Sequence, residues 1–136
     1  MPHVIVEYSA NLENELEVQG LLDALHDAAL RTGVFPIGGL RTRGARRESY
    51  RIADGHVQNA FVHVVLRIGH GRDLDTRKQA AQAVFDALCS HLQPVFAHSP
   101  LAISLELQEI DPVLSYKKNN LHDYVRQRQA TVEGAQ

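Results

Sequence analysis

Hydrophobic and polar positions along the first half of the chain predict a strand, a helix and a second strand. Residues 3–8 are mostly β-branched or aromatic, which is typical of a buried strand. From about Asn14 the apolar residues recur at helical spacing, and Gly33 predicts the end of that helix. An interrupted strand is predicted from Leu40 to Ile52, followed by a turn at residues 53–55. The positions that define the helix are Val18, Leu21, Leu22, Leu25, Ala28 and Ala29.

The second half repeats this order. Residues 61–68 read as a strand, and Gly69-His70-Gly71 is a tight connection to a helix capped by Asp73 or Asp75. Pro94 predicts that this helix ends or bends late. Residues 101–108 alternate apolar and polar side chains, which predicts a strand with one buried face. The predicted apolar face of the helix consists of Leu74, Ala81, Val84, Phe85, Leu88 and Leu92.

This pattern predicts an α/β (α+β) fold made of a pair of β-α-β units. The strands would form one four-stranded mixed sheet with two helices on one face. We expect a single domain over residues 1–136, with unit one at about 2–55, unit two at about 60–111 and a tail at 112–136. No third long helix is predicted, so the second sheet face needs cover, and oligomerisation is the simplest source of it. Residues 114–125 would add a short strand or helical turn against a neighbouring subunit, and residues 130–136 would fray.

Composition narrows the class of protein. The 136 residues are 44% hydrophobic and 22% charged, which is ordinary for a globular chain. A net charge of −2 gives no general attraction to nucleic acid or to an anionic membrane. The single cysteine cannot form an internal disulfide, and no apolar run approaches the roughly 20 residues that cross a bilayer. The first ten residues do not resemble a signal peptide, so we expect a cytoplasmic protein.

Pro2 is the first candidate for chemistry. Initiator methionine is normally removed before a small residue, and the mature chain would then begin with a secondary amine on a buried strand. Apolar surroundings and nearby cations disfavour an ammonium ion and lower its pKa toward neutrality. Such an amine is a good general base at physiological pH. Position alone fits equally a proline that simply begins the chain, so other features must decide.

Arginines near the second strand are candidates for anion binding. Arg41 and Arg43 share a face of that strand, and arginine binds carboxylates through two parallel hydrogen bonds. A solvated edge strand is the alternative interpretation. A nucleic-acid surface is poorly supported, because Tyr50 is the only aromatic residue among these arginines. Further arginines follow at positions 46, 47 and 51.

Arg72 lies in a Gly-rich connection between a strand and a helix, where backbone amides and a cation could bind an anion. The lysine and Ser/Thr of a phosphate loop are missing, so a structural turn is the alternative. Eight histidines are present, but none forms an H-x-x-x-H pair beside an acid or cysteine, so no metal or other cofactor is expected. Cys89 reads as a small core residue. Ser-His-Asp catalysis has no nucleophile elbow to support it.

Four segments carry a resemblance to a known family: MPHVIVEYSANL, TGVFPIGGLRTR, ADGHVQNAFVHVVLRIGHGRDLDTRKQ and SYKKNNLHDY. They resemble the 5-carboxymethyl-2-hydroxymuconate isomerases of the tautomerase superfamily, over nearly the whole chain to about Tyr124. The resemblance implies a homotrimer with active sites near subunit boundaries, Pro2 as the catalytic base, and Arg41 and Arg72 on the carboxylates of a small tricarboxylate dienol. It also implies ketonisation of that dienol to a 2-oxo-3-ene in aromatic (homoprotocatechuate) catabolism, without a cofactor.

Two other classes remain open. A broader tautomerase acting on phenylpyruvate or 2-hydroxymuconate would retain Pro2 and need fewer arginines. A non-catalytic trimeric interaction module would keep the fold without depending on Pro2. Should Pro2 not be the base, His3 or Glu7 would be the next candidates.

Overall fold

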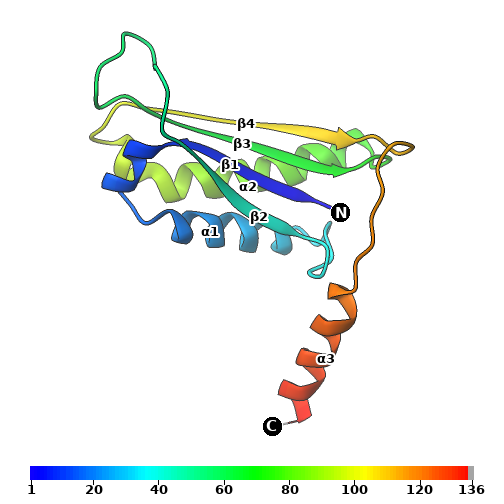
Figure 1. The fold of residues 1–136 in the computed structure, drawn as a ribbon. Helices are drawn as coiled ribbons and strands as arrows, with labels where there is room; N and C mark the ends of the chain where they lie inside the picture. Colours follow the sequence, from blue (N-terminus) through cyan, green and yellow to red (C-terminus); the bar gives the residue numbers. More distant parts are fainter. Residues whose placement is uncertain (135–136) are drawn as a thin grey trace.

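A four-stranded mixed sheet with two long helices packed on one face forms the body of the molecule (Figure 1). This computed structural model describes residues 1–134. In chain order the elements are β1 (His3–Ser9), a 3-10 helix η1 (Ala10–Asn14), α1 (Val18–Arg31), β2 (Arg41–Arg47), β3 (Ala60–Gly69), α2 (Leu74–Phe96), β4 (Leu101–Ile110) and α3 (Leu121–Gly134).

The strand directions bring one end of every strand to a common edge. The sheet order is β2-β1-β3-β4, with β1 parallel to β2, β3 parallel to β4, and β1 antiparallel to β3. β1 and β2 therefore begin at the edge where β3 and β4 end (Figure 1). At this edge His3 lies between Arg41 on β2 and Arg67 on β3. The predicted fold class is confirmed.

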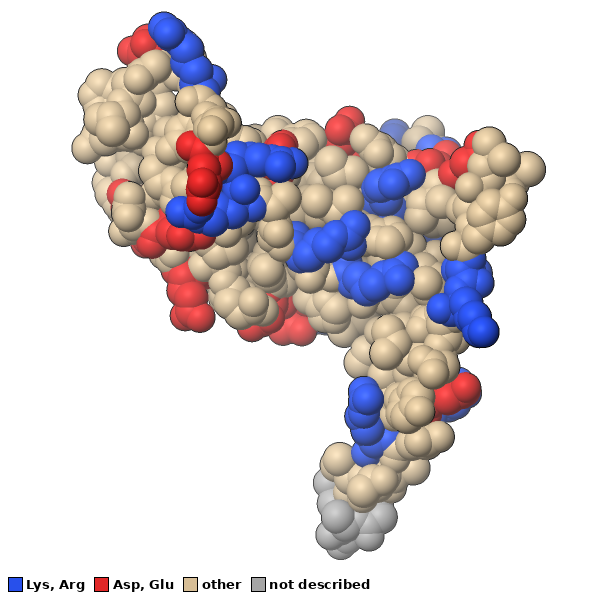
Figure 2. Space-filling model, viewed as in Figure 1, with Lys and Arg blue, Asp and Glu red and all other residues tan. Residues whose placement is uncertain are grey.

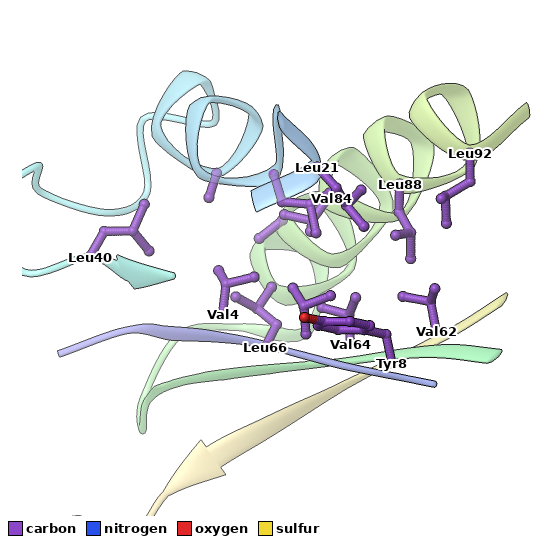
Figure 3. Close-up of a cluster of buried hydrophobic side chains, with 14 of the residues drawn as sticks. Val4, Tyr8, Leu21, Leu40, Val62, Val64, Leu66, Val84, Leu88 and Leu92 are labelled. Carbon is purple, nitrogen blue, oxygen red and sulfur yellow. The ribbon is translucent and has the colours of Figure 1, made fainter. Parts of the chain in front are cut away.

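The hydrophobic core lies between the sheet and the two helices (Figure 3). Alternate residues of β1 and β3 point toward the helices, as the pleat of a strand requires. Burial of each large aliphatic side chain contributes about 1.5–3 kcal/mol, so these positions hold the sheet and the helices together. Fully buried members include Val4, Val6, Leu21, Leu25, Val62, Val64, Leu66, Val84, Leu88 and Leu92.

Several element boundaries agree with the sequence and others do not. Asp73 caps α2, since its side chain accepts a hydrogen bond of 2.8 Å from the Thr76 backbone amide. α2 continues past Pro94 to Phe96. α1 begins at Val18 rather than near Asn14, because residues 10–14 form the separate 3-10 helix. β2 pairs only over residues 41–47, which is shorter than the predicted interrupted strand.

Two predicted core positions on α2 are wrong. Leu74 is 54% exposed, because the buried stripe of the helix runs through Ala80, Val84, Leu88 and Leu92. Cys89 is only half-buried and does not belong to that stripe. What burial it has raises the pKa of the Cys89 thiol, with Asp86 adding to the effect.

The prediction that no third long helix exists is also wrong. α3 is 14 residues long, and it runs away from the sheet instead of covering it (Figure 1). It continues through residues 130–134, which had been expected to fray, while residues 135–136 lie outside the described residues. The sheet face opposite α1 and α2, here called the open face, thus has no helix of its own chain over it within residues 1–134. No helix in that range is long and apolar enough to cross a membrane.

Candidate active site

A pocket of about 590 Å³ lies at the edge where β1 and β2 begin, and we call it the N-terminal pocket. Met1, His3 and Arg41 line one side of it. The other side comes from the residues that follow β3 and β4. These residues are Gly69, His70, Ile110, Asp111, Pro112, Ser115, Tyr116, Lys117 and Lys118.

Pro2 is buried directly beside this pocket, at the start of β1. Its carbonyl oxygen accepts a hydrogen bond of 3.2 Å from the Arg41 backbone amide, which ties the chain start to β2. The preceding residue, Met1, lines the pocket. Burial lowers the pKa of the Met1 α-amino group, and the positive charges of Lys117, Arg41 and Arg72 lower it further. An amine at this place therefore has a weakened tendency to carry a proton.

His3 lies between two guanidinium groups on the open face. Its Nε2 atom is 3.2 Å from Nη2 of Arg41, and its Nδ1 atom is 3.1 Å from Nη1 of Arg43. A neutral imidazole has one acceptor nitrogen, so it can accept from only one of these donors at a time. Burial lowers the pKa of His3 to about 4, followed by the charges of Arg41 and Arg43. At neutral pH the ring is uncharged and is a weak base.

Arg41 keeps part of its hydrogen-bonding capacity unused. Its Nε atom is buried and has no hydrogen-bond partner among the described residues. No salt bridge joins Arg41 to a carboxylate of residues 1–132, whose side chains the structure describes. A buried guanidinium donor without a partner is costly, and an anion in the pocket would relieve that cost.

Arg72 lies near the pocket but does not line it. Its Nη2 atom donates to the Val34 carbonyl oxygen at 3.1 Å, and its guanidinium lies 5.4 Å from the centre of the Phe35 ring. Arg77 holds the same connection by donating to the Arg72 carbonyl oxygen at 3.1 Å. Of the three site residues that the sequence suggests, Arg41 lines the pocket, Pro2 lies between the lining residues Met1 and His3, and Arg72 is not part of the lining.

The sequence did not assign the residues that line the opposite side of the pocket. His70, Lys117 and Lys118 come from connections after β3 and β4, so only the strand directions bring them to the chain start. The adjacent lysines in SYKKNN were the available signal, since two exposed lysines in a segment between elements have no packing role. Within residues 1–134, no group of three His, Cys, Asp or Glu side chains could hold a metal ion.

Positive charge dominates the middle of the visible face of the molecule (Figure 2). Lys and Arg side chains lie across the centre of this view, while the acidic side chains are seen mainly nearer its edges. Because the net charge of the whole chain is −2, this is a local concentration and not a global excess. The pocket and its surroundings can therefore attract a small anion.

Comparisons with known proteins identify the family of this chain. The family model of 5-carboxymethyl-2-hydroxymuconate isomerase matches residues 2–125. A 5-carboxymethyl-2-hydroxymuconate Delta-isomerase of Escherichia coli is 38% identical over 122 residues, which are 90% of this chain and 97% of that protein. The crystal structure of a 5-carboxymethyl-2-hydroxymuconate isomerase from Deinococcus radiodurans R1 has a TM-score of 0.84 and 37% identity, covering 92% of this chain and 94% of the other.

More distant structures share the fold alone. A fused 4-OT described as a symmetric trimer has a TM-score of 0.57 and 21% identity, covering 87% of this chain and 92% of that one. This structure shares the paired β-α-β architecture of the present chain, as the sequence predicts. The chain belongs to the 5-carboxymethyl-2-hydroxymuconate isomerase family and is an isomerase.

Proposed function

We propose that this protein ketonises 5-carboxymethyl-2-hydroxymuconate in the N-terminal pocket, with the free amine of Pro2 as general base. The observation that carries the proposal is the position of the chain start, which lies in a pocket with Arg41 and two lysines. Because Met1 lines this pocket, its removal would leave the Pro2 nitrogen facing the space that Met1 now borders. The reaction needs no cofactor, since one base can take a proton and return it.

The proton transfer conserves all atoms of the substrate. The Pro2 nitrogen takes the proton of the 2-hydroxyl group, and the electron pair moves through the conjugated double bonds toward carbon five. The resulting ammonium then gives its proton to carbon five, which yields the 2-oxo-3-ene product. The low proton affinity of the amine at this place supports the first step, because a neutral amine is required.

The arginines would hold the substrate and prepare the base. Arg41 lines the pocket and has an unpartnered donor, so we assign it to a substrate carboxylate. Arg72 lies close enough to affect the chain-start amine, and we assign it to a second carboxylate or to charge developing on the 2-oxygen. Because the Nη2 atom of Arg72 already donates a hydrogen bond to the Val34 carbonyl oxygen, the other guanidinium nitrogens would contact the substrate.

His3 and Glu7 are weaker candidates for the base. His3 has a pKa of about 4 and would rarely take up a proton at neutral pH. Glu7 is paired with Arg47 at 2.7 Å and does not line the pocket.

We further propose that the protein acts as a homotrimer in the cytoplasm, in aromatic compound catabolism. The symmetric trimer among the structures that share its fold supports the assembly state.

The test is a comparison of substrates and arginine variants in protein whose N-terminus is shown by mass to be Pro2. A charged hydrogen bond contributes about 1.5–3 kcal/mol, so Arg41→Ala should lower kcat/KM for the tricarboxylate by roughly 10- to 150-fold. Arg72→Ala should lower it similarly and also lower the melting temperature, because the Val34 carbonyl loses its donor. Arg46→Ala is the control, since Arg46 pairs with Glu13 and Glu48 away from the pocket.

Equal losses in the Arg46 and Arg41 variants would contradict the assignment of the arginines. A wild-type protein that prefers phenylenolpyruvate or 2-hydroxymuconate to the tricarboxylate would favour the broader tautomerase. A trimeric protein that isomerises neither the tricarboxylate, nor 2-hydroxymuconate, nor phenylenolpyruvate would favour the non-catalytic interaction module.

A further inference from the structure

Residues 111–119, here called the strap, cross one side of the N-terminal pocket and are fixed at both ends. At the first end the Asp111 carboxylate accepts hydrogen bonds from the backbone amides of Val113 at 2.8 Å and Leu114 at 2.7 Å. At the other end the Asn119 side chain donates to the Gly38 carbonyl oxygen at 2.9 Å. The same side chain accepts from the Leu121 amide at 2.8 Å, which starts α3. Hydrogen bonds at both ends therefore fix the strap where it lines the pocket.

Lys117 and Lys118 lie near the second anchor of the strap, and both line the pocket. Among the side chains of residues 1–132, neither lysine forms a salt bridge. Asp111 is the one carboxylate among the lining residues, and its Oδ1 atom accepts hydrogen bonds from the backbone amides that it caps. Two cations without an intramolecular carboxylate thus face a pocket that already contains Arg41.

Lys117 is distinguished from Lys118 by its effect on the chain start. Among the charges that lower the pKa of the Met1 amine, Lys117 ranks ahead of Arg41 and Arg72. Lys118 is not among them. Of the two lysines in the strap, Lys117 is therefore the one whose charge acts on the amine at the chain start.

Arg41 and Arg72 account for at most two of the three carboxylates on the proposed substrate, so at least one carboxylate needs another cation. Lys117 and Lys118 are the further cations that line the pocket. We propose that the ammonium of Lys117 binds the third carboxylate, so that Lys117 sets the preference for tricarboxylate over dicarboxylate dienols. This inference rests on the proposed function, because that function supplies the identity of the substrate.

The first experiment measures kcat/KM of Lys117→Met on the tricarboxylate and on 2-hydroxymuconate, which lacks the carboxymethyl arm. Loss of one solvent-accessible charged contact should lower kcat/KM for the tricarboxylate by about 10-fold. The value for the dicarboxylate should change by less than about 3-fold at a fixed pH above the pKa of the amine. Lys117→Arg should restore most of the tricarboxylate activity, and Lys78→Met, on the exposed surface of α2, should match the wild type.

The pH dependence of kcat/KM is a second measurement, and it would not change if Lys117 had only a structural role. The charge of Lys117 lowers the pKa of the Met1 amine, and we expect it to lower the pKa of the Pro2 amine in the same way. Lys117→Met should therefore shift the acidic limb of kcat/KM to higher pH, and Lys117→Arg should not. Equal losses on both substrates with an unshifted profile, or no loss on either, would overturn the inference.

Binding of tricarballylate, an unreactive tricarboxylate, separates this inference from the proposed function. Calorimetry should give a dissociation constant about 10-fold higher for Lys117→Met than for the wild type and Lys78→Met. If the wild type fails to ketonise the dienol but tricarballylate binding still depends on Lys117, the proposed function is wrong and the carboxylate site stands. If ketonisation is normal and Lys117→Met changes neither substrate preference nor tricarballylate binding, the inference is wrong and the function stands.

Discussion

His3 shows how neighbouring charges set the state of a single residue at this site. The ring lies between Arg41 and Arg43, and Arg67 lies opposite it on β3. Each of these cations, together with burial, disfavours a protonated imidazole. The neutral ring can accept a hydrogen bond from an arginine and so holds a guanidinium in place. We interpret His3 as a positioning residue for Arg41, not as a base.

This interpretation predicts a pH dependence with a definite sign. An NMR titration should give His3 a pKa of about 4, well below the ordinary value of 6.5. Because the unfolded chain binds this proton more readily, the contribution of His3 to stability is present above pH 6.5 and is lost as the pH falls toward 4. The free energy of unfolding of wild type, relative to His3→Gln, should therefore decrease over that interval. An ordinary titration near 6.5 would contradict this account.

At the scale of elements, the close packing of the strap against the loop before β2 positions Lys117. Gly38 leaves no room for a side chain, since an added Cβ would lie 2.5 Å from Nδ1 and 2.8 Å from Cα of His122. The start of α3 would have to move away. Gly38→Ala should therefore weaken the second anchor of the strap by about 1–3 kcal/mol.

Limited trypsin digestion measures this weakening, because the strap contains Lys117 and Lys118. Cleavage there should be faster in Gly38→Ala than in the wild type, and activity on the tricarboxylate should fall. Gly20→Ala is the matched control, since its Cβ would lie 3.9 Å from the nearest atoms of His91. Removal of a helical glycine should stabilise α1 by about 0.5–1 kcal/mol. Identical cleavage in the two variants would show that the strap does not depend on this contact.

The sequence predicts those elements whose pattern is local. The β-branched run of β1 and the alternation in β4 each determine a buried face without reference to the rest of the chain. α3 was missed because Leu121 and Tyr124 are 43% and 48% exposed, so the helix has little buried stripe to reveal it. Of the residues that line the pocket, the sequence suggests only His3 and Arg41 as candidates, with Pro2 directly beside them. Lys117 reaches it through the direction of β4 and the anchors at Asp111 and Asn119, which no local pattern encodes.

At the scale of the whole molecule, the open face of the sheet is the surface that we expect the proposed trimer to bury. Half-buried apolar residues on this face include Ile5 and Val65, which are opposite one another on β1 and β3. On the neighbouring strand β2, Arg43 is opposite Ile5 and Arg41 is opposite His3. Contact with another subunit would bury these apolar side chains, as expected for the proposed trimer.

Light scattering should therefore give three times the mass of one chain for the wild type. Val65→Glu places a charge in the proposed interface and should yield smaller species with largely unchanged circular dichroism and little activity. Lys78→Glu, on the far side of the sheet, should remain trimeric. A fully active wild-type monomer would contradict the proposed assembly.

The central claim is that the free nitrogen of Pro2 moves the proton, and the N-terminus tests it most directly. Protein that retains Met1 has an amide nitrogen at Pro2, which cannot accept a proton. We expect mass-verified retained-Met1 protein to ketonise the dienol on the order of 10²–10⁴-fold more slowly than processed protein, with the same assembly state and melting temperature. Ketonisation at the full rate by protein that retains Met1 would contradict the mechanism.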